Sequence, residues 1–561
     1  MNRFLSSLAL LLAAASVFAA DATPQRYVVM MRQPATQSRM RMLVSSDEVR
    51  RHDVRTFVNI NAFGATLTGE EVAELRASNE VVSIEPVTLR QASALPASVA
   101  TDATKFATQV VPWGLDAIHA RQVWPVTRGS KSVNVAVLDT GVDDTHPDLK
   151  DAIAGEYNVY DRTDKAIDDS LVGHGTHVSG IIAAADNTIG TVGIAPNTRI
   201  WSVKVLNGNG DGTDEAVALG LDWVISKKRE IGGPWVVNFS LGAPRPADVE
   251  KAAVERALRE GVIIIAAAGN RSLAAVDYPA GYEGVIAVGA LNDKFEVAGF
   301  SSFGTGLALT APGVDIPSTV PVGRAKIAEV DGELGTTRAF ITNGSPFATI
   351  TGQLVYCGFG RVSDFPAGME GKVAIIERGG NLYFGEKSQN AKLAGASAVI
   401  LVNDDDDAHF ELSGWNLPTE VCDAVDGCTV LPQFVGYQFP LTVAMSRKDG
   451  APLLQKAGRS VVTVSARAED YAILGGTSMA APHGTGTAAL LLALDPTLTA
   501  EQIEFVMETT SKDYAAPGWD VKYGYGALDA LAAAQYVAPA KFGLTEQPKP
   551  RPAPRRRASL H

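Results

Sequence analysis

The sequence predicts an α/β protein: a parallel sheet with helices on both faces, preceded by a small α+β unit and interrupted by a β-rich insertion. Three observations predict this class. Apolar strands alternate with helices between Val111 and Gly313, a strand, strand, helix, strand pattern lies upstream, and a glycine-rich block of short strands precedes one last long helix. A chain of 561 residues has room for two to four folded units.

The main unit is predicted from its alternation of strands with helices. Helices are expected over residues 214–227, 249–260 and 475–494, and strands over residues 134–138, 199–205, 235–239, 262–268 and 285–288. Strands joined by helices pair in parallel, and sites form in such sheets at the carboxyl ends of the strands.

The upstream unit is predicted from shorter signals. Strands are expected over residues 26–31, 57–68 and 81–84, the second of them turning at Gly64, and the sequence T-G-E-E from Thr68 is typical of a helix start. Residues 88–108 lack periodicity and are rich in Ala, Ser and Thr. We expect them to form an exposed linker in which cleavage is easy.

The two ends of the chain differ from the rest in composition. A basic n-region at Arg3, an apolar stretch over 5–18 and small residues after it form the pattern of a signal peptide over residues 1–20. No later apolar run is long enough to cross a bilayer, so an exported protein without a membrane anchor is expected, extracellular or periplasmic. Residues 541–561, rich in Pro and Arg, are predicted to be disordered.

Charge and cysteine content exclude some classes of function. The net charge of −13 argues against a general nucleic-acid-binding protein, which needs a basic face. Of the three cysteines, Cys422 and Cys428 either close a short disulfide loop and leave Cys357 over, or all three stay free thiols. No pair has zinc-ligand spacing with a nearby histidine.

Three segments contain the residue types needed for nucleophilic acyl transfer. Asp139 ends an apolar strand in VNVAVLDTGVDDTHPDL, His174 precedes a helix in GHGTHVSG, and Ser478 begins a long apolar helix in GGTSMAAPH. A serine hydroxyl is a weak nucleophile until a base takes its proton, and a buried carboxylate holds the imidazole in the tautomer that does so. One such segment is weak evidence, whereas all three in this order are specific.

The three segments resemble the signature motifs of the subtilisin family of serine proteases. The segment WVVNFSLG resembles the family strand that offers backbone groups to an extended peptide, here at Ser240, Leu241 and Gly242. The segment IIIAAAGN matches the family segment with the oxyanion asparagine, here Asn270. The resemblance implies an endopeptidase acting on proteins or peptides. An esterase, or a binding protein with an idle triad, is the alternative.

The resemblance also implies a division of the chain. NAFGATLTGEEVAELRASNEVVSIEP resembles an inhibitory propeptide, and GKVAIIERGGNLYFGEKSQNAKLAGASAVILVND a protease-associated domain. The expected units are a signal peptide (1–20), a propeptide with its linker (21–107), a peptidase domain in two parts (108–322 and 469–540), an inserted protease-associated domain (323–468) and the tail (541–561). The propeptide is expected to act as an intramolecular inhibitor.

A structural calcium site is carried over from the family by position. Its ligands are expected to be Gln109, Asp148, Asn187 and the backbone carbonyls of Ala185, Ile189 and Thr191. This mixture of carboxylate, amide and carbonyl oxygens suits calcium. A loop that holds no metal is the alternative.

One specificity residue follows from the same resemblance. Tyr278-Pro279 resembles a landmark beside the primary specificity pocket, and the residue before it, Asp277, is expected on the pocket floor. A carboxylate there pairs with a lysine or arginine placed just before the scissile bond. The alternative is that Asp277 points to solvent or caps a turn.

Overall fold

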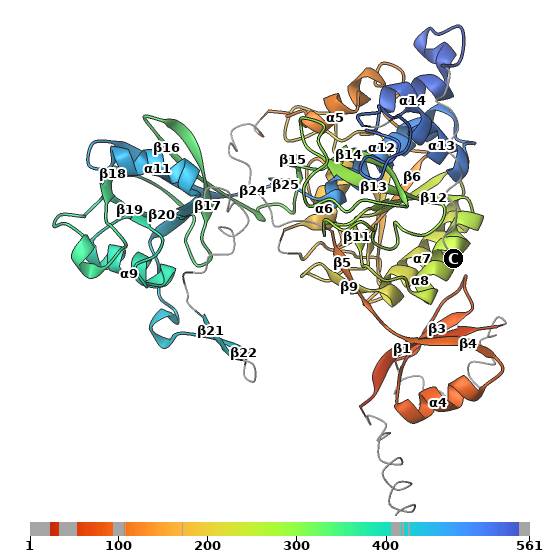
Figure 1. Cartoon of the computed structure of the whole chain (residues 1–561), viewed down its shortest axis with the longest axis horizontal. Coiled ribbons are helices and arrows are strands. Elements are labelled where there is room, and N and C mark those ends of the chain that lie inside the picture. The colour runs from red at the N-terminus through yellow and green to blue at the C-terminus, as the bar shows by residue number, and fades with distance from the viewer. Residues whose placement is uncertain are drawn as a thin grey trace, which may run out of the picture.

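The computed structural model describes residues 23–32, 53–93, 106, 108–170, 172–404, 417, 420–423, 427–515 and 517–548. The predicted signal peptide lies outside these residues. Figure 1 shows three bodies: a main domain, a small N-terminal unit beneath it, and a separate barrel to one side.

The main domain is built on a parallel sheet, as predicted. Within the described residues seven strands pair in the order β14-β13-β12-β10-β6-β8-β7. Their bounds are Leu307–Pro312, Val285–Leu291, Val262–Ala267, Trp235–Phe239, Asn134–Asp139, Arg199–Lys204 and Ile153–Asn158. The two strands that the sequence analysis missed, β7 and β14, lie at the two edges of the sheet.

Helices cover both faces of this sheet because successive strand residues point to opposite sides. In β6, Val135 and Val137 belong to one apolar core, and Ala136 and Leu138 belong to the other. The first core is closed by α6 (His174–Ala183), α12 (Thr477–Leu494), α13 (Ala500–Thr510) and α14 (Ala530–Val537). The second is closed by α7 (Asp214–Ile231) and α8 (Asp248–Arg259).

The N-terminal unit is a four-stranded antiparallel sheet with one helix, in the order β2-β3-β1-β4. These elements are β1 (Gln25–Met31), β2 (Arg55–Thr56), β3 (Ala62–Leu67), α4 (Gly69–Ala77) and β4 (Val81–Pro86). The predicted helix start is confirmed: Thr68 and Glu71 form a reciprocal capping box.

The predicted turn at Gly64 is wrong, because Gly64 lies inside β3 and the strand begins only at Ala62. Instead, this glycine lets β3 approach α7 closely. A Cβ at this position would lie 1.8 Å from Oε1 of Glu215 on α7. That carboxylate pairs with Arg26 of β1 at 2.5 Å, so the missing side chain lets the N-terminal unit reach α7.

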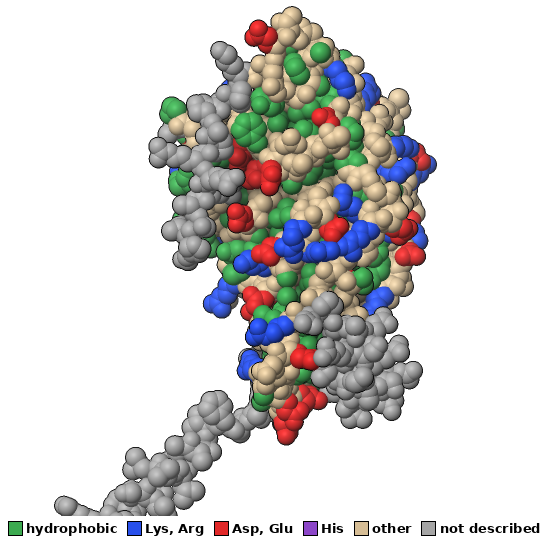
Figure 2. Space-filling model, turned by 90° about the vertical axis from the view of Figure 1, so that its right-hand side faces the viewer, with side chains coloured by type: hydrophobic (Ala, Val, Ile, Leu, Met, Phe, Trp, Pro, Cys, Tyr) green, Lys and Arg blue, Asp and Glu red, His purple; other side chains and the backbone are tan. Residues whose placement is uncertain are grey.

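The sheet of the N-terminal unit packs on α7 and α8. The Asp222 carboxylate of α7 accepts the backbone N–H groups of Val58 and Asn59 at 2.7 and 2.6 Å. Glu85 of β4 accepts the N–H of Asp248 at 3.0 Å, at the N-terminus of α8, where a carboxylate is favoured. Figure 2 shows a band of Lys and Arg side chains with carboxylates among them above this unit.

The predicted exposed linker is partly wrong. Residues Leu89–Ala92 form strand β5, which lies between β9 (Asp211–Thr213) and β11 (Leu241–Gly242) and pairs antiparallel with both. Backbone groups on both edges of this segment are therefore satisfied by the main domain. A strand of four residues with no apolar alternation gives too little local signal to be recognised from sequence.

The insertion contains a closed barrel of seven strands in the described part of the chain. In chain order, the strands of the barrel are β16 (Ala325–Gly332), β17 (Gly335–Ile341), β18 (Ala348–Tyr356), β19 (Val373–Glu377), β20 (Ala398–Val402), β23 (Leu441–Met445) and β24 (Val461–Glu469). Helices α9 (Phe384–Ala394) and α11 (Arg447–Lys456) lie against it.

The cysteines lie in the insertion. Cys357 is a buried free thiol. Cys422 stands opposite Cys428 in a hairpin of β21 (Glu420–Asp423) and β22 (Gly427–Val430). Their disulfide stays a prediction.

The predicted boundary of the disordered tail is wrong by several residues. Lys541 donates to the carbonyl of Leu494 at 3.2 Å, Phe542 packs on the first core, and Gln547 donates to Tyr536 O at 3.0 Å. Contacts with the core thus order the first part of this segment, and residues 549–561 lie outside the description. No helix of the described chain is both long and apolar enough to span a membrane.

Candidate active site

The pairing of β6 with β10 brings two predicted residues to the same edge of the sheet. Leu138 lies opposite Phe239, so Asp139 and Ser240, the next residues, lie at adjacent carboxyl ends. Asp139 Oδ1 is 2.6 Å from Nδ1 of His174, at the start of α6, and both side chains are fully buried. Thr140 N–H donates to the same oxygen at 2.7 Å.

Asp168, which was not predicted from the sequence, supports this pair. Its buried carboxylate accepts the hydroxyls of Thr140, Ser170 and Thr176 at 2.9, 2.6 and 2.7 Å. Ser170 in turn accepts the N–H of His174 at 3.1 Å. The loop before α6 is therefore fixed to the end of β6. The D-D-S run at 168–170, just ahead of the histidine motif, was the available signal.

Ser478 is fixed to the end of β10. It lies in the first turn of α12, which starts after Gly476 at a φ of 146° that favours glycine. The Ser478 hydroxyl donates to Ser240 O at 2.8 Å, and the Ser240 hydroxyl donates to Ser478 O at 2.8 Å. Nε2 of His174 is buried and has no hydrogen-bond partner among the described groups.

Asn270 presents its amide N–H₂ to a carbonyl of the N-terminal segment. Its Oδ1 accepts the N–H and the hydroxyl of Thr477, each at 2.9 Å, which fixes the orientation of the amide. Its Nδ2 then lies 2.5 Å from the carbonyl oxygen of Ser93. The backbone N–H of Ser478 donates to the same oxygen at 3.2 Å. Two donors thus converge on one carbonyl beside a serine hydroxyl.

Ser240, Leu241 and Gly242 hold the segment that carries this carbonyl. The N–H of Ser93 donates to Ser240 O at 3.0 Å, and Leu241 and Gly242 pair with Ala92 and Gln91. The predicted peptide-binding strand is thus paired with an extended segment of the chain itself.

The charge of Asp139 changes the protonation of His174. Burial alone lowers the pKa of this imidazole, but the charge and hydrogen bond of Asp139, with a further contribution from Asp168, raise it above its ordinary value. The arrangement stabilises a proton on the imidazole, as a general base requires after it has taken one.

Asp277 lies between two segments of this site. A Cβ on Gly242 would lie 2.9 Å from Cβ of Asp277, and a Cβ on Gly269 2.4 Å from its Oδ2. The carboxylate is 4% exposed and lies 3.3 Å from Nη1 of Arg271. Burial raises the pKa of Asp277, and Arg271 opposes the shift. The side chain does not point freely to solvent.

Most of the predicted calcium ligands come together beyond the C-terminal end of α6, whereas His174 lies at its N-terminal end. Asp148 is buried, and its Oδ1 lies 2.6 Å from Nδ2 of Asn187. Gln109 Nε2 lies 3.0 Å from Ala185 O, and Thr191 N–H donates to Asp148 Oδ2 at 3.2 Å. A half-turn about the last torsion of an amide exchanges its nitrogen for its oxygen, so these donors fit an oxygen-binding cation.

The loop that contains Asn187 also forms a turn. Ile189 donates its N–H to Asn187 Oδ1 at 2.8 Å and closes a turn. Among the described residues no three His, Cys, Asp or Glu side chains cluster as metal ligands, and the predicted site contains one carboxylate beside amide and carbonyl oxygens.

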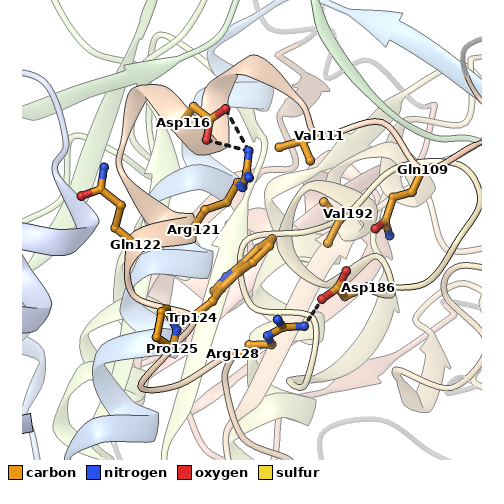
Figure 3. Close-up of a pocket in the computed structure, with 10 residues that line it drawn as sticks. All are labelled: Gln109, Val111, Asp116, Arg121, Gln122, Trp124, Pro125, Arg128, Asp186 and Val192. Atoms are coloured by element: carbon orange, nitrogen blue, oxygen red, sulfur yellow. Dashed lines mark hydrogen bonds and ion pairs between the residues drawn. The ribbon is translucent and has the colours of Figure 1, made fainter.

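A surface hollow lies beside Gln109 and is lined by no triad residue. Figure 3 shows two ion pairs in it, Asp116 with Arg121 at 3.2 Å and Arg128 with Asp186, next to the ring of Trp124. In each pair, the arginine and the aspartate neutralise each other's charge. The residues that line the hollow do not belong to the site built on α6 and α12.

Comparison with known proteins decides the family. A model of the subtilase family matches residues 130–349 and 450–526, and a model of the PA domain matches residues 350–432. The chain belongs to the subtilase family. The barrel extends beyond the PA match on both sides, because β16 and β17 precede it and β23 and β24 follow it.

Relatives agree with this assignment. The subtilase is 36% identical over 310 residues to subtilisin NAT of Bacillus subtilis subsp. natto, across 54% of this chain and 75% of that protein. The crystal structure of the psychrophilic subtilisin-like protease Apa1, from the Antarctic psychrotroph Pseudoalteromonas sp. AS-11, superposes with a TM-score of 0.52 at 26% identity, over 77% of this chain and 99% of that one.

The fold also matches fervidolysin from Fervidobacterium pennivorans, a keratinolytic enzyme related to subtilisin. The TM-score is 0.56 at 23% identity, over 93% of this chain and 62% of that one, which supports the fold alone. The predicted enzyme class is confirmed: the subtilase is a subtilisin-type serine endopeptidase.

The raised pKa of His174 predicts the acid limb of the pH profile. A general base works only when neutral, so activity should fall as pH drops through the pKa of His174, and the limb of kcat/KM should lie above the ordinary histidine value of about 6.5. Asp139→Asn should move the limb to lower pH and lower kcat steeply, because the partner that raises the pKa and fixes the tautomer is lost.

The control is Asp529→Asn, which removes the carboxylate of the partly buried His119–Asp529 pair. Its profile should match that of the wild type. A wild-type limb at or below pH 6.5, measured with an uncharged peptide substrate, contradicts the role of Asp139.

Proposed function

We propose that this subtilase hydrolyses peptide bonds with Ser478 as nucleophile, His174 as general base, Asp139 as the carboxylate that orients it, and Asn270 as oxyanion donor. One observation carries the proposal: the Ser93 carbonyl oxygen is 2.5 Å from Asn270 Nδ2 and 3.2 Å from Ser478 N, while Ser93 N pairs with Ser240 O. This is the arrangement that a substrate carbonyl needs for attack by a neighbouring hydroxyl.

The chemistry follows from these contacts. Ser478 Oγ gives up its hydrogen bond to Ser240 O and attacks the carbonyl carbon of Ser93 as its proton passes to His174 Nε2, which is buried and has no hydrogen-bond partner among the described groups. Negative charge collects on the oxygen that faces Asn270 and the Ser478 N–H. The protonated imidazole then gives its proton to the leaving amine, and water releases the acyl group by the same route.

The same contacts support self-processing of a precursor. The bond attacked in this arrangement joins Ser93 to Ala94, so we propose it as the first maturation site. The pairing of β5 on both edges supports an extended peptide as substrate rather than a simple ester. The signal-peptide pattern at residues 1–20 supports export of this precursor.

The N-terminal unit is proposed to inhibit the enzyme after cleavage. Its contacts with α7 and α8 do not involve the scissile bond, so they persist when that bond is cut: Arg26 with Glu215, and Val58 and Asn59 with Asp222. The unit then keeps β5 paired between β9 and β11 and excludes other peptides. It corresponds to the propeptide, within residues 21–107.

Calcium is proposed to stabilise the loop after α6. Asp148, Asn187 and Gln109, with the carbonyls of Ala185, Ile189 and Thr191, would hold the ion. Their convergence around a buried carboxylate supports the site. The ion supplies charge compensation to Asp148 and cross-links the segments that contain its ligands.

Ser478→Ala tests the catalytic assignment. The variant keeps the backbone N–H but loses the nucleophile, so it should accumulate as a precursor cut neither at Ser93–Ala94 nor elsewhere by itself, with no activity on denatured protein. N-terminal sequencing and mass spectrometry measure this. The matched control Ser363→Ala changes an exposed serine of the barrel and should mature normally. A Ser478→Ala protein that matures alone contradicts the proposal.

Calcium removal should lower the melting temperature of the mature enzyme. A ligand that binds only the folded state adds about 2.7 kcal/mol at a hundredfold excess over its dissociation constant. Scanning calorimetry with calcium and with chelator measures the shift. Asp148→Asn should abolish the difference, while the exposed neighbour Asp151→Asn should keep it. Equal melting temperatures of the wild type in both conditions contradict the site.

Asp277 is proposed to favour lysine or arginine just before the scissile bond. Its burial between Gly242 and Gly269 supports this, although Arg271 competes for the carboxylate. Ser93 occupies that position in the precursor. Because Ser93 is covalently part of the same chain, it is held there without the affinity that a basic side chain would give a free peptide. In a peptide library, Asp277→Gly should shift preference from basic to large apolar residues, and the exposed control Asp293→Gly should not. An unchanged profile in Asp277→Gly overturns the assignment.

A further inference from the structure

Strand β5, which pairs with β9 and β11, forms a buried ion pair with the catalytic domain. Arg90 of β5 donates from Nε to Glu250 Oε1 at 2.9 Å and from Nη2 to Oε2 at 3.0 Å. The two side chains are 1% and 0% exposed. This is a bidentate contact between a planar guanidinium and a carboxylate, the geometry that distinguishes arginine from lysine.

The surroundings of the guanidinium consist of acceptors. Nη1 donates to the Thr88 hydroxyl and the Leu89 carbonyl, both at 3.0 Å, and Nη2 also reaches the carbonyl of Arg245 at 3.4 Å. The Thr88 hydroxyl donates to the buried carboxylate of Asp214 at 2.6 Å. Two carboxylates of the catalytic domain therefore lie near one cation.

Glu250 is also hydrogen-bonded within the catalytic domain. It lies on α8, and the Tyr282 hydroxyl lies 3.0 Å from Oε2, the oxygen that also accepts from Nη2 of Arg90. Burial raises the pKa of Glu250, and the hydrogen bonds and charge of Arg90 counteract that rise. An unpaired carboxylate in this position is costly, so the site gains most from a cation that fits it.

Arg90 does not belong to the mature enzyme in the proposed processing scheme. It stands three residues before Ser93, on the propeptide side of the proposed scissile bond, and it leaves its place between β9 and β11 when the propeptide is removed. Glu250, Asp214 and Tyr282 stay. The vacated pocket is then open to the side chain of a substrate residue in the same register, since β5 is held by backbone pairing with β9 and β11.

We propose that Glu250, with Tyr282 and Asp214, forms an acidic subsite that selects arginine as the fourth residue before the scissile bond. The inference rests on the proposed function, because the register is counted from Ser93. The enzyme then acts on polypeptides that carry arginine at this position. Lysine is a poorer occupant, because its single ammonium cannot make the two parallel contacts to Glu250.

The test compares octapeptides with the sequence of residues 88–95 in which lysine replaces Ser93, Thr-Leu-Arg-Gln-Ala-Lys-Ala-Leu, flanked by a fluorophore and a quencher. The lysine satisfies the preference proposed for Asp277, and mass spectrometry restricts kcat/KM to the bond after this lysine. The position of Arg90 carries arginine, lysine, leucine or citrulline, the uncharged isostere of arginine. With mature wild-type enzyme, kcat/KM should be about 30-fold or more higher for arginine than for citrulline or leucine, as expected for loss of one partner of a buried charge pair. Lysine should fall between them.

Glu250→Gln then identifies the residue responsible. The variant should lose the preference for arginine over citrulline, so that kcat/KM becomes similar for the two peptides. The matched control Glu255→Gln, on the exposed face of the same helix, should behave as the wild type. If Glu250→Gln does not mature, the wild-type comparison of arginine with citrulline decides alone.

The outcomes separate this inference from the proposed function. Cleavage of all four peptides after the lysine that replaces Ser93 with similar kcat/KM overturns the acidic subsite and leaves the catalytic proposal intact. Cleavage of none of them, by enzyme active on denatured protein, overturns the register counted from Ser93 and the subsite with it. A preference for arginine that survives in Glu250→Gln also overturns the assignment.

Discussion

The parallel pairing of β6 with β10 is the constraint on which the rest of the site depends. It sets the register in which Asp139 and Ser240 end their strands side by side. Asp139 then fixes His174, and Ser240 exchanges two hydrogen bonds with Ser478. Three residues that are far apart in sequence are thus positioned from the ends of two paired and fully buried strands, which deform little.

The sequence was informative where chemistry and periodicity coincide. Asp139, His174, Ser478 and Asn270 stand in segments with strong motifs, and the central strands of the sheet are continuous apolar runs. The edge strand β7, Ile153–Asn158, is only half-buried and mixes apolar with polar residues. Its hydrophobic pattern was therefore too weak for a strand to be predicted there.

The contacts that were not predicted from the sequence join segments that are far apart along the chain. Arg90 and Glu250 are separated by 160 residues, and neither has a neighbour in sequence that identifies its partner. The strand character of Leu89–Ala92 likewise comes from β9 and β11 rather than from its own composition. Such features are products of the tertiary fold, and a single sequence records only the residues involved.

The pairing of β15 (Ile316–Thr319) with β25 (Tyr471–Leu474) has a consequence for how the chain tolerates its insertion. These antiparallel strands bring the two ends of the barrel segment together, with Ile316 opposite Leu474. To the peptidase domain, the whole barrel is a long hairpin loop. The entropy of closing a loop grows only with the logarithm of its length, about 0.6 kcal/mol for each doubling. An entire additional domain therefore adds little to the entropic cost of joining the two halves of the catalytic sheet and helix layer, and gain or loss of that domain is a small step for the fold.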